Sequence, residues 1–362
     1  MVVDARSIPQ ILMIGPDRKA AGGIATVLNT YASSSLRTRY AIEWVATTDS
    51  RSRVRGALAL FRALVRVAVV CFRSRGHVLI HVHMASRGSF VRKAAILSVG
   101  RALGATTIVH LHGGGFDLYA SDGPRFLQRA IRHTFESSDR VFVLSEAWRL
   151  KLRTFGGDAN VAVLPNPVAV PPLRVEPRAG VLYAGRLSAG KGVLDLIEAI
   201  EILQIEAVDV HWVLAGDEPD GRIVPAVSGL PDPSAVWLPG WLDAPALDEL
   251  MWSSAVFCLP SHAEGSPVAL LEAMSREMAC VVTPVGGVPD MVVDGSTAVV
   301  IPVGDARAIA EAVRRLVSDP ELCVRLGQAA RRTVVDRNEL EVVVCLLVEQ
   351  YCSLGFEPEA AT

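Results

Sequence analysis

The sequence predicts an α/β protein of two doubly wound domains that face each other across a cleft. Short apolar runs alternate with helix-period segments along the whole chain, and a Pro-rich stretch divides it near the middle. The two halves also carry opposite charge. At 362 residues the chain is long for one hydrophobic core and comfortable for two.

The first half of the chain alternates between strand-like and helix-like segments. The strand-like runs span residues 11–15, 41–47, 77–83, 106–113, 140–145 and 161–166. Amphipathic helices are expected near residues 22–33, 54–74, 87–103 and 123–137. This alternation is typical of right-handed βαβ units that form a parallel sheet covered on both faces. Residues 1–170 are therefore expected to form an N-terminal Rossmann-like domain.

The stretch "NPVAVPPLRVEPRAG" (166–180) has several prolines and no apolar period, so it reads as an interdomain linker. Strand-like runs then resume at residues 180–186, 210–217, 235–241, 255–261, 279–286 and 298–303. Helices are expected near residues 191–206, 244–253, 267–276, 305–317 and 320–334. Residues 171–340 are expected to form a C-terminal Rossmann-like domain. Residues 341–362 are a helix and tail that can pack back on the first domain.

Charge and cysteine content indicate two modules in a reducing compartment. Residues 1–170 have 23 basic and 10 acidic side chains, whereas residues 171–362 have 13 and 28, which suggests different partners. The six cysteines form no C-x-x-C pair and most lie in apolar runs, as buried thiols of a cytoplasmic protein do. No secretory signal is expected, and the apolar segment 57–72 contains Arg62 and Arg66 and is too short to span a bilayer.

The stretch "SHAEGSPVALLEAM" (261–274) holds two glutamates eight residues apart. Glu264 follows a buried strand, after which Ser266 fits a helix N-cap and Pro267 the first helical position. The free N–H groups of Val268 and its neighbours, which include Gly265 in the preceding turn, would form an anion site with the helix dipole that suits phosphate. Glu272 lies about five residues into the helix, where its carboxylate can accept from a ribose diol while Glu264 accepts from sugar hydroxyls. Two such glutamates alone are more often a solvated loop and helix face.

Support for a ligand site comes from "YAGRLSAGKG" (183–192), in which Arg186 ends a strand and Lys191 opens a helix. Two cations at the carboxyl end of a parallel strand are well placed for a diphosphate. An ordinary loop with charged tips would explain this stretch by itself, but not jointly with Glu264 and Glu272.

The N-terminal half contributes glycines and histidines. Gly22 and Gly23 lie between the first strand and its helix, where backbone can approach a phosphate, although the full G-x-G-x-x-G pattern is absent. His112 ends the fourth strand before three glycines and is expected to face the cleft. We interpret His81, His83 and His110 as polar strand residues satisfied inside the sheet. No metal-binding motif or nucleophile elbow is present, so no metal or other cofactor is expected.

Together, "PSHAEGSPVALLEAM", "YAGRLSAGKG", "AGGIATVLN", "VLPNPV" and "PVGGVPDMVVDG" resemble the retaining glycosyltransferases of family 4, which have the GT-B fold. The resemblance extends from Gly22 to about Gly295. It implies that the N-terminal domain binds the acceptor and that the C-terminal domain binds the nucleotide sugar. It implies that Glu264 binds the donor sugar, Glu272 the ribose, and Arg186 and Lys191 the diphosphate, with backbone N–H groups near Val268 and Gly23.

The resemblance further implies that His112 is the family's cleft histidine and that Trp241 neighbours the base. The chain departs from the family pattern at residues 277–279 and at Asp290, which weakens a substrate assignment more than a reaction class. The stretch 81–97 resembles the bacterial branch that builds exopolysaccharides. We expect no carboxylate nucleophile; instead Arg186, Lys191 and the helix start before Val268 would stabilise the departing diphosphate.

A helical projection of residues 51–73 predicts an arginine stripe. Five arginines fall within about 60° of one another at 100° per residue, and the other faces are nearly all apolar. They are Arg51, Arg55, Arg62, Arg66 and Arg73. A surface helix of a doubly wound domain can look like this. The alternative is a peripheral protein at an anionic inner membrane face that uses a lipid-linked saccharide acceptor.

Two other classes of function stay open at this point. One is a nucleotide-sugar epimerase or a phosphorylase of the same fold, although the acid/base carboxylates or cofactor lysine that these need are not evident. The other is a non-catalytic nucleotide-sugar-binding subunit. Nucleic acid is not an expected partner.

Overall fold

The computed structural model describes residues 10–48 and 53–358, and its chain divides into two compact units. Unit 1 comprises Met1–Pro167 together with Leu340–Thr362, and unit 2 comprises Val168–Glu339. Each unit has one six-stranded parallel sheet and its own hydrophobic core. The strands lie at the twelve apolar runs of the sequence, because strands buried on both faces must be apolar on both sides.

The sheet of unit 1 has the strand order β2-β1-β3-β4-β5-β6. The strands are β1 (Gln10–Gly15), β2 (Ala41–Ala46), β3 (Leu79–Met84), β4 (Thr106–Leu111), β5 (Arg140–Val143) and β6 (Val161–Val163). The chain moves from β1 outward to β2, returns past β1 to β3, and then continues in order. This reversal places the carboxyl ends of β1 and β3 at a switch point, where ligands of open α/β sheets bind.

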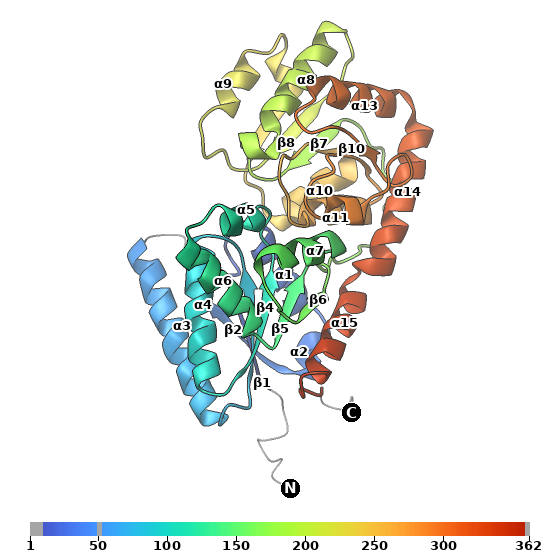
Figure 1. The fold of residues 1–362 in the computed structure, drawn as a ribbon. Helices are drawn as coiled ribbons and strands as arrows, with labels where there is room; N and C mark the ends of the chain where they lie inside the picture. The colour runs from blue at the N-terminus through green and yellow to red at the C-terminus, as the bar shows by residue number, and fades with distance from the viewer. Residues whose placement is uncertain (1–9, 49–52, 359–362) are drawn as a thin grey trace. The chain divides into compact units, whose positions relative to one another are not determined.

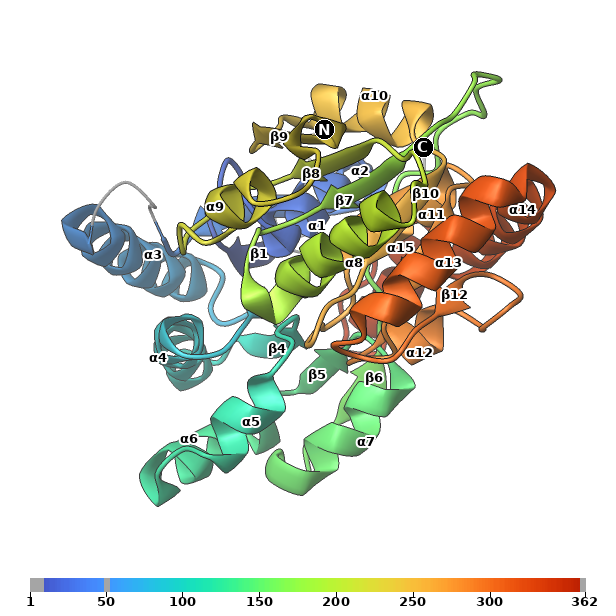
Figure 2. The same ribbon diagram turned by 90° about the horizontal axis from the view of Figure 1, so that it is seen from above.

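Helices cover both faces of this sheet (Figures 1 and 2). One face carries α3 (Arg53–Arg73), α4 (Gly88–Ala102), α6 (Arg125–Glu136) and α7 (Glu146–Phe155), with the short α5 (Phe116–Ser121) before α6. The other face carries α1 (Gly23–Ala32), the short α2 (Leu36–Arg39) and α15 (Leu340–Cys352). Right-handed crossovers require this switch of faces when the strand order reverses.

The last helix, α15, is an integral part of unit 1. Its Tyr351 hydroxyl lies 2.7 Å from His81 Nδ1 on β3, and Gln350 accepts from Arg140 at 2.7 Å. Glu341 accepts from the Ser35 backbone at 2.9 Å. Val343, Val344 and Leu347 are completely buried.

The sheet of unit 2 has the order β12-β11-β10-β7-β8-β9. The strands are β7 (Val181–Ala184), β8 (Trp212–Ala215), β9 (Val236–Gly240), β10 (Val256–Leu259), β11 (Ala279–Val282) and β12 (Val299–Val300). The helices are α8 (Val193–Ile205), α9 (Ile223–Ser228), α10 (Ala244–Ser253), α11 (Val268–Ser275), α12 (Val288–Met291), α13 (Ala306–Ser318) and α14 (Pro320–Arg337). The order reverses between β7 and β10, so the loops after these two strands flank a second switch point.

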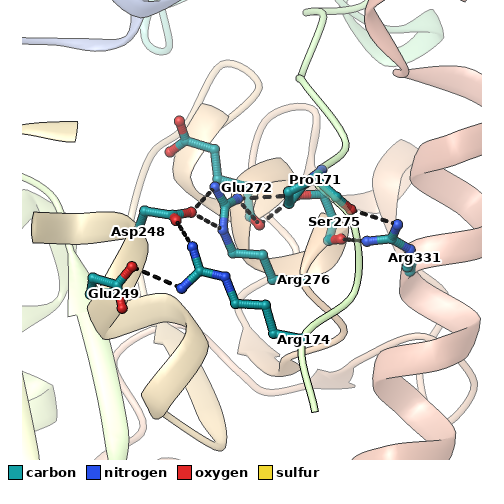
Figure 3. Close-up of polar contacts among 8 residues, drawn as sticks. All are labelled: Pro171, Arg174, Asp248, Glu249, Glu272, Ser275, Arg276 and Arg331. Atoms are coloured by element: carbon teal, nitrogen blue, oxygen red, sulfur yellow. Dashed lines mark hydrogen bonds and ion pairs between the residues drawn. The ribbon is translucent and has the colours of Figure 1, made fainter. Parts of the chain in front are cut away.

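Side-chain contacts bind the Pro-rich segment to unit 2 (Figure 3). Arg174 pairs with Asp248 and Glu249 at 3.1 and 2.8 Å, and Arg331 donates to the Pro171 carbonyl at 2.8 Å. Arg174 and Arg178 also lie over the Trp252 ring. Residues 171–178 therefore form a strap along this unit.

Five of the helices are not expected from the sequence. The longest of them is α7, which Ser145 caps by accepting from the Trp148 N–H at 3.3 Å. The others, α2, α5, α9 and α12, have four to six residues, too few to show an amphipathic period.

All six cysteines are free, and Cys71, Cys258 and Cys280 are buried whereas Cys345 is exposed. Over the part of the chain that the structure describes, none of the helices combines the length and apolar character needed to cross a bilayer.

Candidate active site

The carboxylate of Glu264 lies in the loop that follows β10, where two donors hold the same oxygen. Lys191 Nζ and Ser261 Oγ each lie 2.7 Å from Glu264 Oε1. The Glu264 side chain is only 7% exposed, whereas that of Lys191 is 32% exposed. A buried carboxylate is tolerated when it is paired and hydrogen-bonded, so this cluster holds the Glu264 carboxylate in place with its second oxygen available.

Two glycines allow this loop to approach its neighbours. Gly192 and Gly286 have φ of +68° and +60°, and a Cβ on either would overlap a carbonyl oxygen, that of Pro260 or of Glu264. His262 links the loops further, because its N–H donates to the Gly190 carbonyl at 3.1 Å. The β7–α8 and β10–α11 loops are thus bonded into one structure at the carboxyl edge of the sheet.

The start of α11 differs from the sequence expectation. The helix begins at Val268 with Pro267, not Ser266, at the N-cap position, and no side chain caps it. Ser266 Oγ instead lies 3.6 Å from Met291 Sδ, and the Gly265 carbonyl accepts from the Gly287 N–H at 2.7 Å. Proline has no backbone N–H, so no hydrogen bond is lost when it stands at this position. The first N–H groups of α11 lack helical acceptors, as at any helix start.

Glu272 is the fifth residue of α11. Burial raises the pKa of its carboxyl group to about 7, an effect opposed by Arg276 and reinforced by Asp248. Arg276 donates instead to Asp248 at 2.8 Å and to the Glu272 backbone carbonyl at 2.8 Å. In Figure 3 the Glu272 carboxylate points away from this arginine network, which leaves it open to another partner.

The two predicted cations have different surroundings. Arg186 is exposed, with its Nε 4.0 Å from Asp217 Oδ2, and its carbonyl accepts from the Tyr183 hydroxyl at 2.8 Å. Lys191 does not open a helix, contrary to expectation. It ends the 3₁₀ turn η1 (Ala189–Lys191), and α8 begins only at Val193, because Gly192 adopts a left-handed conformation at the N-cap. This detour brings the amine to Glu264.

In unit 1, Gly22 is the N-cap of α1 and Gly23 its first residue. Gly22 has φ of +119°, a backbone region that favours glycine, and a Cβ there would meet no atom within 4 Å. The start of α1 therefore presents bare backbone N–H groups, in agreement with the expected geometry.

Four histidines form a stack in unit 1. His83 Nδ1 lies 2.8 Å from His112 Nε2, and His81, His83 and His110 are completely buried. Burial is the main cause that lowers the pKa of all four, to about 3 for His81 and His112. The rings are therefore neutral at pH 7.

The expectation that His81, His83 and His110 are satisfied inside the sheet is wrong in part. His81 Nε2 and both ring nitrogens of His110 are buried and have no hydrogen-bond partner of ordinary geometry. The nearby Leu164 backbone raises the pKa of His110, but burial lowers it by more. Nitrogens of all three rings lie within 4.8 Å of one another, so they form a group that can hold a metal ion. The group could have been predicted from the strand register, because His83 on β3 is paired with His110 on β4.

On α3, Arg55, Arg62 and Arg73 are exposed, whereas Arg66 is bound to Glu43 through two bonds of 2.6 and 2.8 Å. Arg51 lies outside the described residues. Beside this stripe is an exposed apolar stripe, in which Phe61 is 63% and Phe72 82% exposed. Leu58 and Val65 complete the apolar stripe.

In unit 2, Trp241, which the family resemblance places beside the base, is exposed.

Comparison with known proteins assigns both units. Residues 22–167 match the family "Glycosyl transferase 4-like domain", and residues 171–333 match "Glycosyl transferases group 1". The boundary between the two matches coincides with the boundary between the units.

Several curated proteins are similar to parts of the chain. Alpha-D-kanosaminyltransferase from Streptomyces kanamyceticus is 33% identical over 50% of this chain and 47% of its own length. The putative colanic acid biosynthesis glycosyltransferase WcaL of Escherichia coli is 26% identical over 71% of this chain and 66% of its own length. The chain spans less than half of the length of the first relatives that it matches.

Solved structures share the fold over nearly the whole chain. A sucrose-phosphate synthase from Thermosynechococcus elongatus superposes with a TM-score of 0.79 at 18% identity, over 96% of this chain and 99% of that one. Anabaena HepE, solved in complex with UDP, gives a TM-score of 0.73 at 19% identity, over 95% of this chain and 100% of that one.

Proposed function

Because the chain belongs to the glycosyltransferases that join a 4-like domain to a group 1 domain and adopts the GT-B fold, we propose that it transfers a sugar, with retention, from a nucleotide-diphosphate sugar. The donor site proposed is the carboxyl edge of the unit 2 sheet, at the loops that follow β7 and β10. The observation that carries the proposal is the bonded set of Lys191, Ser261 and Glu264 beside the start of α11.

Each group in this site suits one part of the donor. The available oxygen of Glu264 accepts from a sugar hydroxyl, because its partner oxygen is already held by Lys191 and Ser261. The first N–H groups of α11 and the exposed guanidinium of Arg186 suit the diphosphate. Glu272 suits the ribose diol. We propose a uridine nucleotide as the donor of this chain, because HepE was solved with UDP and with UDP-glucose.

The chemistry proposed is electrostatic. As the bond between the sugar and the diphosphate breaks, negative charge grows on the leaving oxygen, and Arg186, Lys191 and the α11 start stabilise it without reorganisation. The amine of Lys191 has three N–H bonds and uses one for Glu264, so the others can reach a phosphate oxygen. The acceptor oxygen bonds to the anomeric carbon on the face that the diphosphate leaves, and the leaving oxygen takes the proton of the acceptor hydroxyl.

For the acceptor we propose a lipid-linked saccharide at an anionic membrane surface. The support is α3, which has three kinds of face: a buried apolar face, an exposed arginine stripe and an exposed apolar stripe. Helices of this composition lie in the interface of anionic bilayers. Relatives named for capsular polysaccharide and colanic acid biosynthesis agree with such an acceptor.

The test has two parts. A thermal-shift panel of UDP, GDP, ADP and their sugars identifies the base, because saturation at a hundredfold over Kd stabilises the fold by about 2.7 kcal/mol. Release of nucleoside diphosphate is then followed with membrane lipid extracts as acceptor. We expect release that requires the acceptor, and an anomeric configuration of the product equal to that of the donor. Binding without any release would instead indicate a non-catalytic nucleotide-sugar-binding subunit.

A further inference from the structure

Lys93 is a lysine buried inside unit 1. It lies in the second turn of α4 and is 2% exposed. Its amine donates to Ser89 Oγ at 3.0 Å, and the same oxygen accepts from the Ala85 N–H at 3.1 Å. Burying an ammonium group without a counter-charge is costly, and lysines are rarely buried unless paired.

The groups around Lys93 are basic or neutral. Arg92 lies beside it on α4, and the rings of His83 on β3 and His112 after β4 are close enough for Lys93 to lower their pKa values. Arg92 has a buried Nε with no hydrogen-bond partner. Among the residues that the structure describes, no carboxylate lies within salt-bridge distance of Arg92 or Lys93, and none acts on the pKa of either.

The side chains of Arg92 and Lys93 lie at the start of α4. Lys93 and Arg92 both reach back one turn toward the start of α4, since a Cβ on Gly88 would lie 3.1 Å from Arg92 Nη1. The first turn of α4 contains no acidic residue, so the positive end of this 15-residue helix adds to the same field. The His112 N–H donates to the Met84 carbonyl at 2.8 Å, which keeps the end of β4 beside the end of β3.

We propose that Arg92 and Lys93, the basic cluster, bind a phosphate-class oxyanion beside the neutral His112 ring, at the carboxyl ends of β3 and β4. The Arg92 guanidinium and the Lys93 ammonium group at a helix start suit an oxyanion with more than one negative charge, such as phosphate. In the ligand-free protein, burial and Arg92 lower the pKa of Lys93 to about 7, so the amine is part neutral. A bound anion replaces the missing counter-charge and the amine becomes fully protonated.

The acceptor assignment that follows rests on the proposed function: the oxyanion belongs to the acceptor, as the phosphate or diphosphate that joins a saccharide to its lipid. Binding of the oxyanion itself does not depend on sugar transfer. The two ideas can therefore fail separately, because phosphate binding is measured without a donor and donor turnover without added phosphate.

The experiment uses the scarcity of lysine in this chain, which has only Lys19, Lys93, Lys151 and Lys191. Protein labelled with ¹³C at the lysine ε-carbon gives four side-chain NMR signals, each of which can be titrated. The titration is run in inorganic phosphate and in pyrophosphate, with sodium chloride at equal ionic strength as the reference. We expect phosphate or pyrophosphate to raise the Lys93 pKa to about 8 or higher, with Lys19 unchanged.

Lys93→Met removes the charge at similar volume and is expected to weaken phosphate binding at least about tenfold, whereas the exposed Lys19→Met is its matched control. If Lys93→Met does not fold, the other three single variants assign the Lys93 signal by elimination. A Lys93 pKa that stays unchanged in both anions overturns the proposal. Glycerol 3-phosphate and vesicles that contain phosphatidic acid separate a soluble from a lipid-borne phosphate, since only the effective source shifts the signal.

Discussion

Lys191 and Arg186 are proposed to act on the same diphosphate, but only Lys191 is paired with a buried carboxylate. Arg186 has a long, exposed ion pair with Asp217 at 4.0 Å. Replacing Lys191 with Met leaves the buried Glu264 carboxylate with Ser261 as its remaining donor, which is destabilising by about 1–3 kcal/mol. Replacing the exposed Arg186 with Met removes no such contact. We expect both variants to lose about a hundredfold in kcat, because each removes one preorganised charge.

Stability distinguishes the two variants. Lys191→Met should lower the melting temperature by several degrees, and Arg186→Met should leave it unchanged. Turnover of either variant within a few-fold of the unmodified enzyme would contradict the proposed role of its cation. Equal melting temperatures for the two variants would contradict the structural role of Lys191.

The proposed contact of Glu272 with the ribose makes donor binding depend on pH. Its folded-state pKa of about 7 lies above the 4.5 of a free glutamate carboxyl group, so the folded protein favours the protonated form. The stability that Glu272 contributes is therefore present at low pH and is lost as the pH rises through 7. Ribose hydroxyls bind the ionised form, so the nucleotide Kd should fall by up to about tenfold between pH 6 and pH 8. Glu272→Gln should flatten this profile, as measured by calorimetry, while Glu198→Gln on the exposed side of α8 should not. The same pH slope in Glu272→Gln would assign it to another group.

At this scale the sequence identifies residues but not their partners. Glu264 and Glu272 were evident from a local pattern, because they belong to one loop and one helix. The bond from Lys191 to Glu264 joins residues 73 apart and depends on the left-handed turn at Gly192. Lys93 gave no signal, since one lysine in an amphipathic segment normally lies on its solvated face.

Among the elements, α3 carries the membrane proposal. Reversing Arg62 and Arg73 to Glu should weaken binding to anionic vesicles at least about tenfold, because each basic residue contributes about 1 kcal/mol near such a surface. Replacing Phe61 and Phe72 with Ser should weaken it without changing its salt dependence. Vesicle sedimentation at low and high salt measures both effects.

The control for the α3 variants is a pair of exposed arginines in unit 2. Arg307→Glu with Arg325→Glu changes the net charge by the same amount at the other end of the chain. Equal loss of vesicle binding in this control would show that total charge, and not α3, governs the interaction. Absence of vesicle binding in the unmodified protein would remove the peripheral-membrane proposal.

Elements long enough to show a period were predictable, and short ones were not. All twelve strands were evident because central parallel strands are continuous apolar runs, as in β10 and β11. The error at the start of α11 arose from two adjacent residues that both favour a helix start. Serine and proline satisfied the sequence rule one position too early, and the packing of the Gly286 turn against Glu264 set the actual boundary.

For the whole molecule, the separate cores of the two units predict separate responses to ligands. Hydrogen exchange in the presence of UDP near its Kd should slow in residues 186–192 and 262–272 of unit 2. Phosphate should slow exchange in residues 85–93 and 112–115 of unit 1. Mass spectrometry of peptides resolves these segments. Protection by UDP confined to unit 1 would refute the donor site proposed in unit 2.

The discontinuity of unit 1 has a consequence for how this protein is made. Its sheet is complete once residue 163 has been synthesised, yet α15, which covers one face of that sheet and bonds to His81, is encoded after all of unit 2. On the ribosome, unit 2 can fold while unit 1 still exposes the surface against which Val343, Val344 and Leu347 will pack. Nascent chains stalled before residue 340 should therefore attract chaperones through that uncovered surface, and release of the final helix should end the association.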